Sequence, residues 1–261
     1  MALTALSTVL TAFRGALGFL TRLPVGGDKA AWHAFRRTPA SLPLVGYVVG
    51  ALAALSFVLP VPVPTAVALY LVALVLLTGV THADGLADLG DAAAVHGGVD
   101  VARRREVLKD SQTGVGGVLA VALAFVTLGL GALGLAGTLP RVAFALALAA
   151  EVGAKAGIAL LVCTRTAAHE GLGSALVEGA TPGDLIPVAA AVVPVLAVAA
   201  VTGAGYLAAF AALAAPLGAA WFLGRWADDA LGGINGDVLG AANELGRVAG
   251  VHAGVIAWTL W

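Results

Sequence analysis

The sequence alternates between long apolar runs and shorter polar segments, and this alternation limits the folds open to it. The length of each run is near that of a helix that crosses the hydrocarbon core of a bilayer, which is about 20 residues. The chain of 261 residues is 60% hydrophobic and 11% charged, more apolar than a soluble domain of this size. We therefore predict an all-α fold: a single integral-membrane domain over residues 1–261, a polytopic membrane helix bundle of about seven transmembrane helices. The predicted spans are 41–60, 65–81, 114–137, 141–163, 185–202, 205–223 and 238–261.

The N-terminal segment, residues 1–25, resembles a signal peptide only superficially. It has no basic start, Arg14 interrupts its apolar run, and no small-residue cleavage site precedes Arg22 and Pro24. We predict that it is retained as an amphipathic helix, which lies at the membrane interface or is tucked into the bundle.

Positive side chains are concentrated in one set of the segments that connect the predicted spans. If the N-terminus is cytoplasmic, the loops 82–112, 164–184 and 224–237 lie on the same side, and these parts contain eleven of the fourteen Lys and Arg residues. Arg141 falls on the other side, and the remaining two lie within spans. Cytoplasmic loops carry an excess of Lys and Arg, so we predict a multi-pass protein of the cell (inner) membrane with a cytoplasmic N-terminus.

Net charge and cysteine content argue against several classes of function. The formal net charge is −1, which gives no support for nucleic-acid binding. The single cysteine, Cys163, excludes an internal disulfide and a cysteine-based zinc site.

An acidic triplet follows the second predicted span, in the sequence HADGLADLGD at 82–91. Asp84, Asp88 and Asp91 are spaced so that they lie within about 60° of one another on a helical wheel, with His82 on the opposite side. Three carboxylates on one helix face repel each other unless a cation lies between them, and the small residues among them would let a bulky polyanion approach. We predict a divalent-metal site at the membrane surface that serves a phosphate-bearing substrate. Carboxylate oxygens suit Mg²⁺, and the charge count places the site on the cytoplasmic side. The alternative is a solvated acidic helix start.

A second motif, KDSQTGVGG at 109–117, combines a cation, an acid and a glycine-rich turn before the third span. Free N–H groups at a helix N-terminus favour phosphate, so Lys109, Ser111 and Gly114 are candidate substrate-binding residues. Asp110 is a candidate further metal ligand. The alternative is that Asp110 and Ser111 cap the helix and the glycines allow close helix packing.

A third motif, NGDVLGAANELGR at 235–247, opens the last predicted span. Asn235 belongs to a turn signal, Asp237 is a plausible helix N-cap, and Glu244 lies on the same helix face as Asp237. Glu244 and Arg247 lie inside an apolar helix, where ionisable groups are costly and often functional, or they simply pair with each other.

Two further polar groups are open to the same alternatives. Glu151 and Lys155 are four residues apart in the fourth span, and they either serve function or neutralise each other. In the loop RTAAHEGLG, Arg165 is the preferred anion contact, although any polar residue there could be a surface residue.

Together these segments resemble one family, the adenosylcobinamide-GDP ribazoletransferases, also called cobalamin-5′-phosphate synthases. Two positions depart from the family pattern: Ala92 stands where glycine is usual, and Gln112 where arginine is expected. The segments that carry the resemblance are FLTRLPV at 19–25, HADGLADLGDA at 82–92, LKDSQTGVGGV at 108–118, TRTAAHEGLG at 164–173 and GDVLGAANELGRV at 236–248.

The resemblance implies a magnesium-dependent phosphoryl transfer that joins α-ribazole, or its 5′-phosphate, to adenosylcobinamide-GDP and releases GMP. The implied partners are these small molecules and membrane lipid, with a homo-oligomer possible. On this basis Asp237 or Glu244 orients or deprotonates the attacking hydroxyl, and Arg165 and Lys109 hold pyrophosphate. The implied metal ligands are Asp84, Asp88, Asp91 and Asp110, with Asn235 among the substrate-binding residues.

Two other functions compete with this interpretation. CDP-alcohol phosphotransferases also use an aspartate-rich membrane helix and Mg²⁺, but their pattern requires an arginine near Ala87 and spaced aspartates that Asp100 does not complete. An ion-coupled transporter would explain Glu151 and Glu244, but the spans show no internal repeat.

Overall fold

The computed structural model describes residues 2–95, 101–110 and 112–260, and within these ranges the chain is helical, without a β-strand. This confirms the predicted all-α class. The α-helices are α1 Ala2–Leu20, α2 Lys29–Arg36, α3 Ser41–Ala54, α4 Val63–Thr78, α5 Thr81–Ala93, α6 Val101–Val107, α7 Val115–Ala136, α8 Pro140–Thr164, α9 Leu172–Val177, α10 Leu185–Val192, α11 Pro194–Thr202, α12 Tyr206–Leu231 and α13 Gly236–Leu260. Short 3₁₀ helices occupy Leu55–Phe57 and Pro182–Asp184.

The chain is a multi-pass membrane protein. Among the described residues, four helical stretches are long and apolar enough to cross a bilayer, and up to six are if each of two bent helix pairs counts as one span. The four are α7, α8, α12 and the stretch Pro182–Thr202 that contains α10 and α11. All seven predicted runs are helical, but α13, which carries Asp237, Glu244 and Arg247, is not among these stretches.

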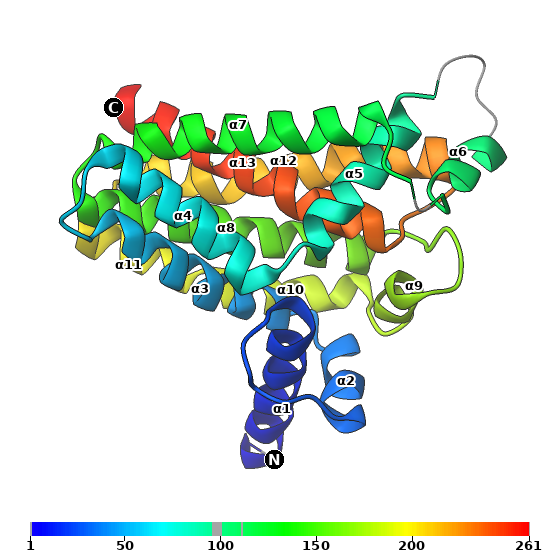
Figure 1. Ribbon diagram of the computed structural model, residues 1–261. Helices are drawn as coiled ribbons and strands as arrows, with labels where there is room; N and C mark the ends of the chain where they lie inside the picture. The colour runs from blue at the N-terminus through cyan, green and yellow to red at the C-terminus, as the bar shows by residue number, and fades with distance from the viewer. Residues whose placement is uncertain (1, 96–100, 111, 261) are drawn as a thin grey trace.

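Helix α8 forms the centre of the bundle and packs against α3, α12 and α13 (Figure 1). The approach is close because glycines on one helix face the backbone of the neighbouring helix. A Cβ on Gly153 would lie 2.7 Å from the Leu213 carbonyl oxygen, and one on Gly46 would lie 2.8 Å from the Val152 Cα. Such small residues allow transmembrane helices to pack backbone to backbone.

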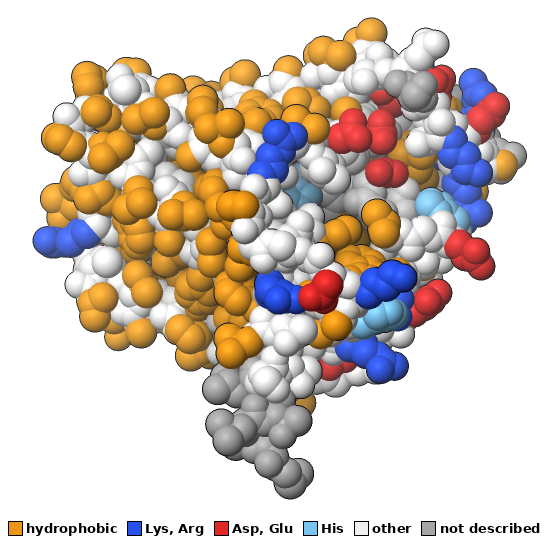
Figure 2. Space-filling model, turned by 60° about the horizontal axis from the view of Figure 1, so that its bottom comes forward, with side chains coloured by type: hydrophobic (Ala, Val, Ile, Leu, Met, Phe, Trp, Pro, Cys, Tyr) orange, Lys and Arg blue, Asp and Glu red, His pale blue; other side chains and the backbone are white. Residues whose placement is uncertain are grey.

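The outer faces of the bundle are apolar. Figure 2 shows hydrophobic side chains over much of the surface, with charged side chains gathered toward one end. On α7, Leu119, Leu123, Val126 and Leu130 are exposed, as expected of a helix whose outer face contacts lipid.

A network of buried ionised groups joins α8 to α13. Arg247 donates to both carboxylate oxygens of Glu151, at 2.6 and 3.1 Å, and to Glu244 at 2.6 Å. The Lys155 Nζ lies 3.3 Å from Glu151 Oε1. The two pairs predicted from the sequence therefore form one network of two cations and two anions. Their mutual neutralisation offsets the free-energy cost of placing charge in an apolar bundle.

Helix α5 turns away from α4 by 94° and crosses one end of the bundle (Figure 1). Gly79, with φ of 70°, is at the turn. A Cβ on Gly85 would lie 2.8 Å from the Asp237 Cα, and one on Gly90 would lie 2.7 Å from the Gly116 carbonyl oxygen. Small residues on α5 thus admit α13 and α7. The expectation that they leave room for a bulky substrate was wrong for these two glycines.

The predicted N-terminal helix is present as α1, which runs across the direction of the bundle helices (Figure 1). It packs against α2, whose N-cap Asp28 accepts a hydrogen bond from the Ala31 N–H at 2.7 Å and pairs with Arg14. The rings of Phe19 and Trp32 lie 5.0 Å apart, centre to centre, between the two helices. The arrangement suits a helix in the plane of the membrane interface.

Removal of one charge from the buried network is expected to destabilise the protein strongly. Glu151→Gln leaves Lys155 and Arg247 with too little negative charge, which costs about 3–5 kcal/mol when a buried partner is lost. The measurement is the thermal unfolding midpoint of the detergent-solubilised protein. In the control Glu106→Gln, an exposed pair with Arg103 is lost, and the expected cost is below about 1 kcal/mol. Equal midpoints for the two variants would contradict this role of the network.

Candidate active site

The polar segments meet at one end of the bundle, as the sequence predicted for the loops 82–112, 164–184 and 224–237. The Ala168 N–H donates to the Ile234 carbonyl at 2.8 Å, and the Ile234 N–H donates to the Thr166 carbonyl at 2.9 Å. From α6, the Arg105 Nε donates to the Leu231 carbonyl at 2.8 Å. These bonds connect three segments that are distant in sequence.

A cavity of about 370 Å³ lies at this end, beside α5 and the first turn of α13. It combines apolar walls with a polar side that includes two carboxylates. The apolar residues that line it include Phe19, Leu20, Leu42, Ile158, Leu172, Leu176 and Leu239, and the polar ones are Thr78, Thr81, His82, Asp84 and Asp237. A hollow with acidic side chains and histidine nearby is visible on this face in Figure 2. Such a cavity can take an apolar group and an anionic group together only if a cation or hydrogen-bond donors offset the carboxylates.

Four aspartates from two helices act on one another here, outside the predicted spans. Burial, followed by the charge of Asp237, raises the pKa of the Asp88 carboxyl to about 6. The charges of Asp84 and Asp91 act in the same direction. Burial also raises the pKa of Asp237, with Asp84 adding to the rise. Asp237, about 150 residues away in sequence, is thus a fourth acid beside the predicted triplet.

Asp91 stabilises the start of another helix, a role that its spacing from Asp84 and Asp88 does not predict. Its two carboxylate oxygens accept hydrogen bonds from the Gly114 and Gly117 N–H groups, at 2.7 and 2.8 Å. Asp91 therefore caps the N-terminus of α7 from a neighbouring helix, because Gly114 has no side chain with which to cap it. The Gly114 N–H, expected to bind phosphate, is used by this bond.

Asn235 positions Asp237 and caps α13. Its Oδ1 accepts from the Val238 N–H at 3.0 Å, and its Nδ2 donates to Asp237 Oδ2 at 2.8 Å. The N-cap of α13 is therefore Asn235, and the prediction that Asp237 caps this helix was wrong. Asn235 is only 4% exposed, so its contribution to the site passes through Asp237.

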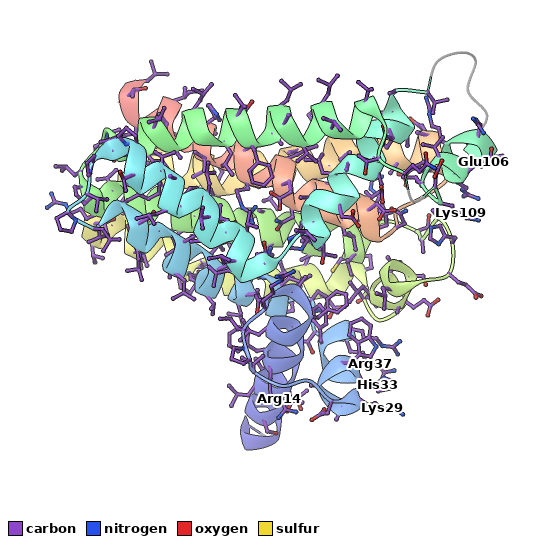
Figure 3. The ribbon with its side chains drawn as sticks, viewed as in Figure 1. Arg14, Lys29, His33, Arg37, Glu106 and Lys109 are labelled. Atoms are coloured by element: carbon purple, nitrogen blue, oxygen red, sulfur yellow. The ribbon has the colours of Figure 1, made fainter. Side chains whose placement is uncertain are left out.

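The predicted anion contacts, Arg165 and Lys109, are not among the residues that line this cavity. Arg165 Nη1 pairs with Asp228 at 2.6 Å, a partner on α12 that no sequence signal identified. Lys109 is exposed beyond the end of α6 (Figure 3), and the Asp110 carboxylate accepts from the Gln112 N–H at 3.0 Å. Ser111 lies outside the described residues. From the loop 164–173, His169 opposes the rise in the pKa of Asp237, but burial prevails and the pKa stays raised.

Glu244 belongs to the buried network and not to the aspartate cluster. Its Oε2 accepts from Arg247 at 2.6 Å, and its Oε1 accepts from Asn243 Nδ2 at 3.1 Å. The network reaches the cavity through His82, which the helical wheel placed opposite the acidic triplet. His82 lies in the first turn of α5, and the cavity extends around this turn to contact both His82 and Asp84.

The donor set fits a magnesium ion that is shared with a substrate. Among the described residues, no three His, Cys, Asp or Glu side chains form a group that could hold a metal ion by themselves. Magnesium usually takes one or two protein carboxylates and completes its shell with phosphate oxygens and water. Asp84, Asp88 and Asp237 offer only oxygen ligands. Burial is the main cause of the raised pKa of Asp88, and repulsion from the neighbouring carboxylates, which a cation would relieve, adds to it.

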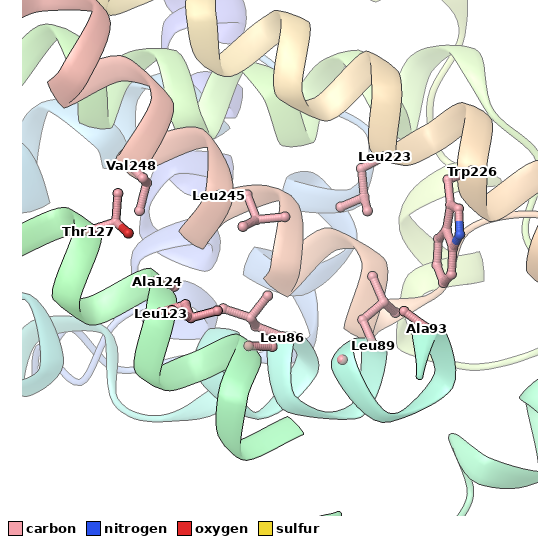
Figure 4. Close-up of a pocket in the computed structure, with 12 residues that line it drawn as sticks. Leu86, Leu89, Ala93, Leu123, Ala124, Thr127, Leu223, Trp226, Leu245 and Val248 are labelled. Atoms are coloured by element: carbon pink, nitrogen blue, oxygen red, sulfur yellow. The ribbon is translucent and has the colours of Figure 1, made fainter. Parts of the chain in front are cut away.

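The opposite face of α5 borders an apolar groove (Figure 4). The groove has a volume of about 440 Å³ and contains Leu86 and Leu89 from α5, Leu123 from α7 and Trp226 from α12. Leu123 is 63% exposed, so the groove opens on the apolar surface of the bundle. Helix α5 thus separates a carboxylate cluster from a lipid-facing groove.

Comparison with known proteins identifies the family. The profile described as cobalamin-5-phosphate synthase matches residues 12–255. The adenosylcobinamide-GDP ribazoletransferase of Haloquadratum walsbyi is 54% identical over 255 residues, covering 97% of this chain and 100% of that protein. The enzyme of that name from Halorubrum lacusprofundi is 52% identical, covering 96% and 99%. That of Citrobacter koseri is 36% identical, covering 90% and 96%. No solved structure matches the chain. The chain is a transferase, and it belongs to the cobalamin-5-phosphate synthase family.

Proposed function

We propose that this protein transfers the cobinamide-phosphate group of adenosylcobinamide-GDP to α-ribazole, or to its 5′-phosphate, and releases GMP in a magnesium-dependent reaction. The family and the names of the relatives support the reaction class. The observation that carries the site is the convergence of Asp84, Asp88 and Asp237 beside a cavity with apolar walls. Phosphoryl transfer depends mainly on positioning and on neutralisation of charge.

Asp84 and Asp88 are the residues that would hold magnesium together with the pyrophosphate of the substrate. The ion supplies neutralisation of the phosphate charge, which otherwise opposes binding next to carboxylates. Asp91 keeps free lone pairs after accepting its two N–H bonds, so it remains a proposed ligand as well. The contacts of Asp110 give no support for a ligand role at the cluster.

Asp237 is the better of the two candidates for the base that receives the hydroxyl proton. The bond from the ribose oxygen to the cobinamide-side phosphorus forms as the bond from that phosphorus to the GMP oxygen breaks, and the hydroxyl proton passes to the Asp237 carboxylate. Asn235 holds this carboxylate in place, and its raised pKa suits a proton acceptor. Glu244 is committed to Arg247 and Asn243, which leaves it poorly placed for the same role.

The charged end of the bundle is proposed to face the cytoplasm. Most Lys and Arg residues lie at this end, whereas Arg141 lies at the other end of the fourth run, where its Nε donates to the Thr202 carbonyl at 2.9 Å. Excess positive charge in short loops favours the cytoplasmic side. Exposed Lys109 and, if it leaves Asp228, Arg165 are the proposed contacts for the arriving pyrophosphate.

Loss of a carboxylate from the cluster tests the site. Asp84→Asn and Asp88→Asn are each expected to lower GMP release by about 100-fold or more, because phosphoryl transfer depends strongly on neutralisation of the phosphate charge. The assay uses purified protein in liposomes with Mg²⁺, adenosylcobinamide-GDP and α-ribazole. The control Asp229→Asn removes an exposed acid from the same end of the bundle and should leave the rate unchanged. A normal rate in both cluster variants would refute the site.

The pKa of Asp88 predicts how pH and magnesium act together on stability. Because this pKa is about 6 in the folded protein, the folded state binds the proton more tightly than the unfolded chain. In EDTA the thermal midpoint should therefore rise as pH falls from about 7 to about 5, and Mg²⁺ should raise it at pH 7 but little at pH 5. Asp88→Asn should reduce both effects. An equal effect of Mg²⁺ at the two pH values would contradict the prediction.

Alanine substitutions of Asp91 and Asp84 should have different effects on stability. Asp91→Ala removes the cap of α7 and should lower stability by about 1 kcal/mol in addition to any loss of activity. Asp84→Ala, a change at an exposed residue whose charge repels Asp88, should lose activity without a fall in the thermal midpoint. Differential scanning fluorimetry of both variants provides the measurement. A midpoint that falls equally in both would show that the cap contributes no special stability.

A further inference from the structure

His82 connects the buried network to the cavity. It is 6% exposed, lies in the first turn of α5 and lines the cavity together with Asp84 and Asp237. Its Nδ1 lies 3.3 Å from Asn243 Nδ2. Within the described parts of the chain, no hydrogen bond involves its Nε2. This atom is also not a fully buried nitrogen without a partner, so part of its surface is accessible. Nε2 is therefore the ring nitrogen left for the cavity.

The network determines which way the Asn243 amide faces. Lys155 Nζ, which can only donate, lies 2.5 Å from Asn243 Oδ1. Glu244 Oε1, which as a carboxylate can only accept, lies 3.1 Å from Asn243 Nδ2. Both contacts place the amide nitrogen on the side of His82, and this nitrogen has a hydrogen to donate.

The amide in turn determines the tautomer of His82. A donor at 3.3 Å requires a lone pair on Nδ1, so the ring hydrogen resides on Nε2. Nε2 then acts toward the cavity as a donor and cannot accept a proton. The nearby Thr78 hydroxyl donates to the Leu74 carbonyl at 2.8 Å, so it offers the cavity no such hydrogen.

We propose that His82 is a further substrate-contacting residue, which donates its Nε2–H to a phosphate oxygen of the substrate nucleotide in the cavity. The inference rests on the proposed phosphoryl-transfer function and assigns a donor to a site otherwise described by acids. A phosphate beside Asp84 and Asp237 needs donors as well as a cation, and a fixed N–H supplies one without reorganisation. On this basis Lys155, Asn243 and Glu244 are positioning residues, because they hold the tautomer.

Two substitutions at one position separate the donor from the packing role. In His82→Gln the amide nitrogen can reach the place of Nε2 and can still donate. In His82→Asn the amide ends near the place of Nδ1, so it keeps a contact with Asn243 but offers the cavity no donor. The expected result is a GMP-release kcat/KM about 10- to 100-fold lower for His82→Asn, the range for a lost hydrogen bond to a charged group. His82→Gln should stay within about fivefold of the unsubstituted protein.

A spectroscopic measurement keeps the inference testable if a variant folds poorly. The ¹⁵N chemical shifts of histidine-labelled protein, assigned by comparison with His82→Asn, should show Nε2 protonated and Nδ1 unprotonated. Protonation of Nδ1, equal activity losses in the two variants, or full activity of His82→Asn would overturn the inference. Absence of GMP release from the unsubstituted protein would instead refute the proposed function, and the tautomer measurement would remain valid.

Discussion

The structure depends on the mutual neutralisation of four ionised side chains inside an apolar bundle. Glu151 and Lys155 on α8 and Glu244 and Arg247 on α13 carry no net charge together, and the Arg247 guanidinium bonds both carboxylates. Isolated ions at this depth would be prohibitively unfavourable, so the two helices must keep the register that joins them. This register places the first turn of α13, with Asp237, at the end of the bundle where α5 crosses.

The acidic cluster is possible because small residues bring backbones together at that crossing. Gly85 touches the backbone of Asp237, and Gly90 touches that of Gly116. Helix α5 is therefore seated on α13 and α7 at the same time, and acids from two helices come within reach of one another. Burial, and after it the repulsion among these acids, raises the pKa of Asp88. Close packing brings these acids together although their charges repel one another. A cation bound between them would relieve this repulsion.

Patterns within a single segment predicted well, and patterns between segments did not. The apolar runs and the spacing of Asp84, Asp88 and Asp91 were sufficient to predict the helices and the acidic face, because helix period and span length are local properties. The pairing of Arg165 with Asp228, the capping of α7 by Asp91 and the choice of Asn235 as a cap depend on residues far apart in the chain. His82 is opposite the triplet on a helical wheel but lines the same cavity as Asp84, because a wheel describes one helix and the cavity is shared by several.

Asp91 also connects the carboxylate cluster to a helix with an apolar, exposed outer face. It holds the first turn of α7, a helix whose outer face is apolar and exposed for most of its length, and it lies one turn from Asp88 on α5. A helix in contact with lipid tilts when the thickness of the hydrocarbon layer changes. A tilt of α7 would be transmitted by two hydrogen bonds to the carboxylate cluster. A change in the thickness of the surrounding bilayer would by this route reach the carboxylates of the proposed site.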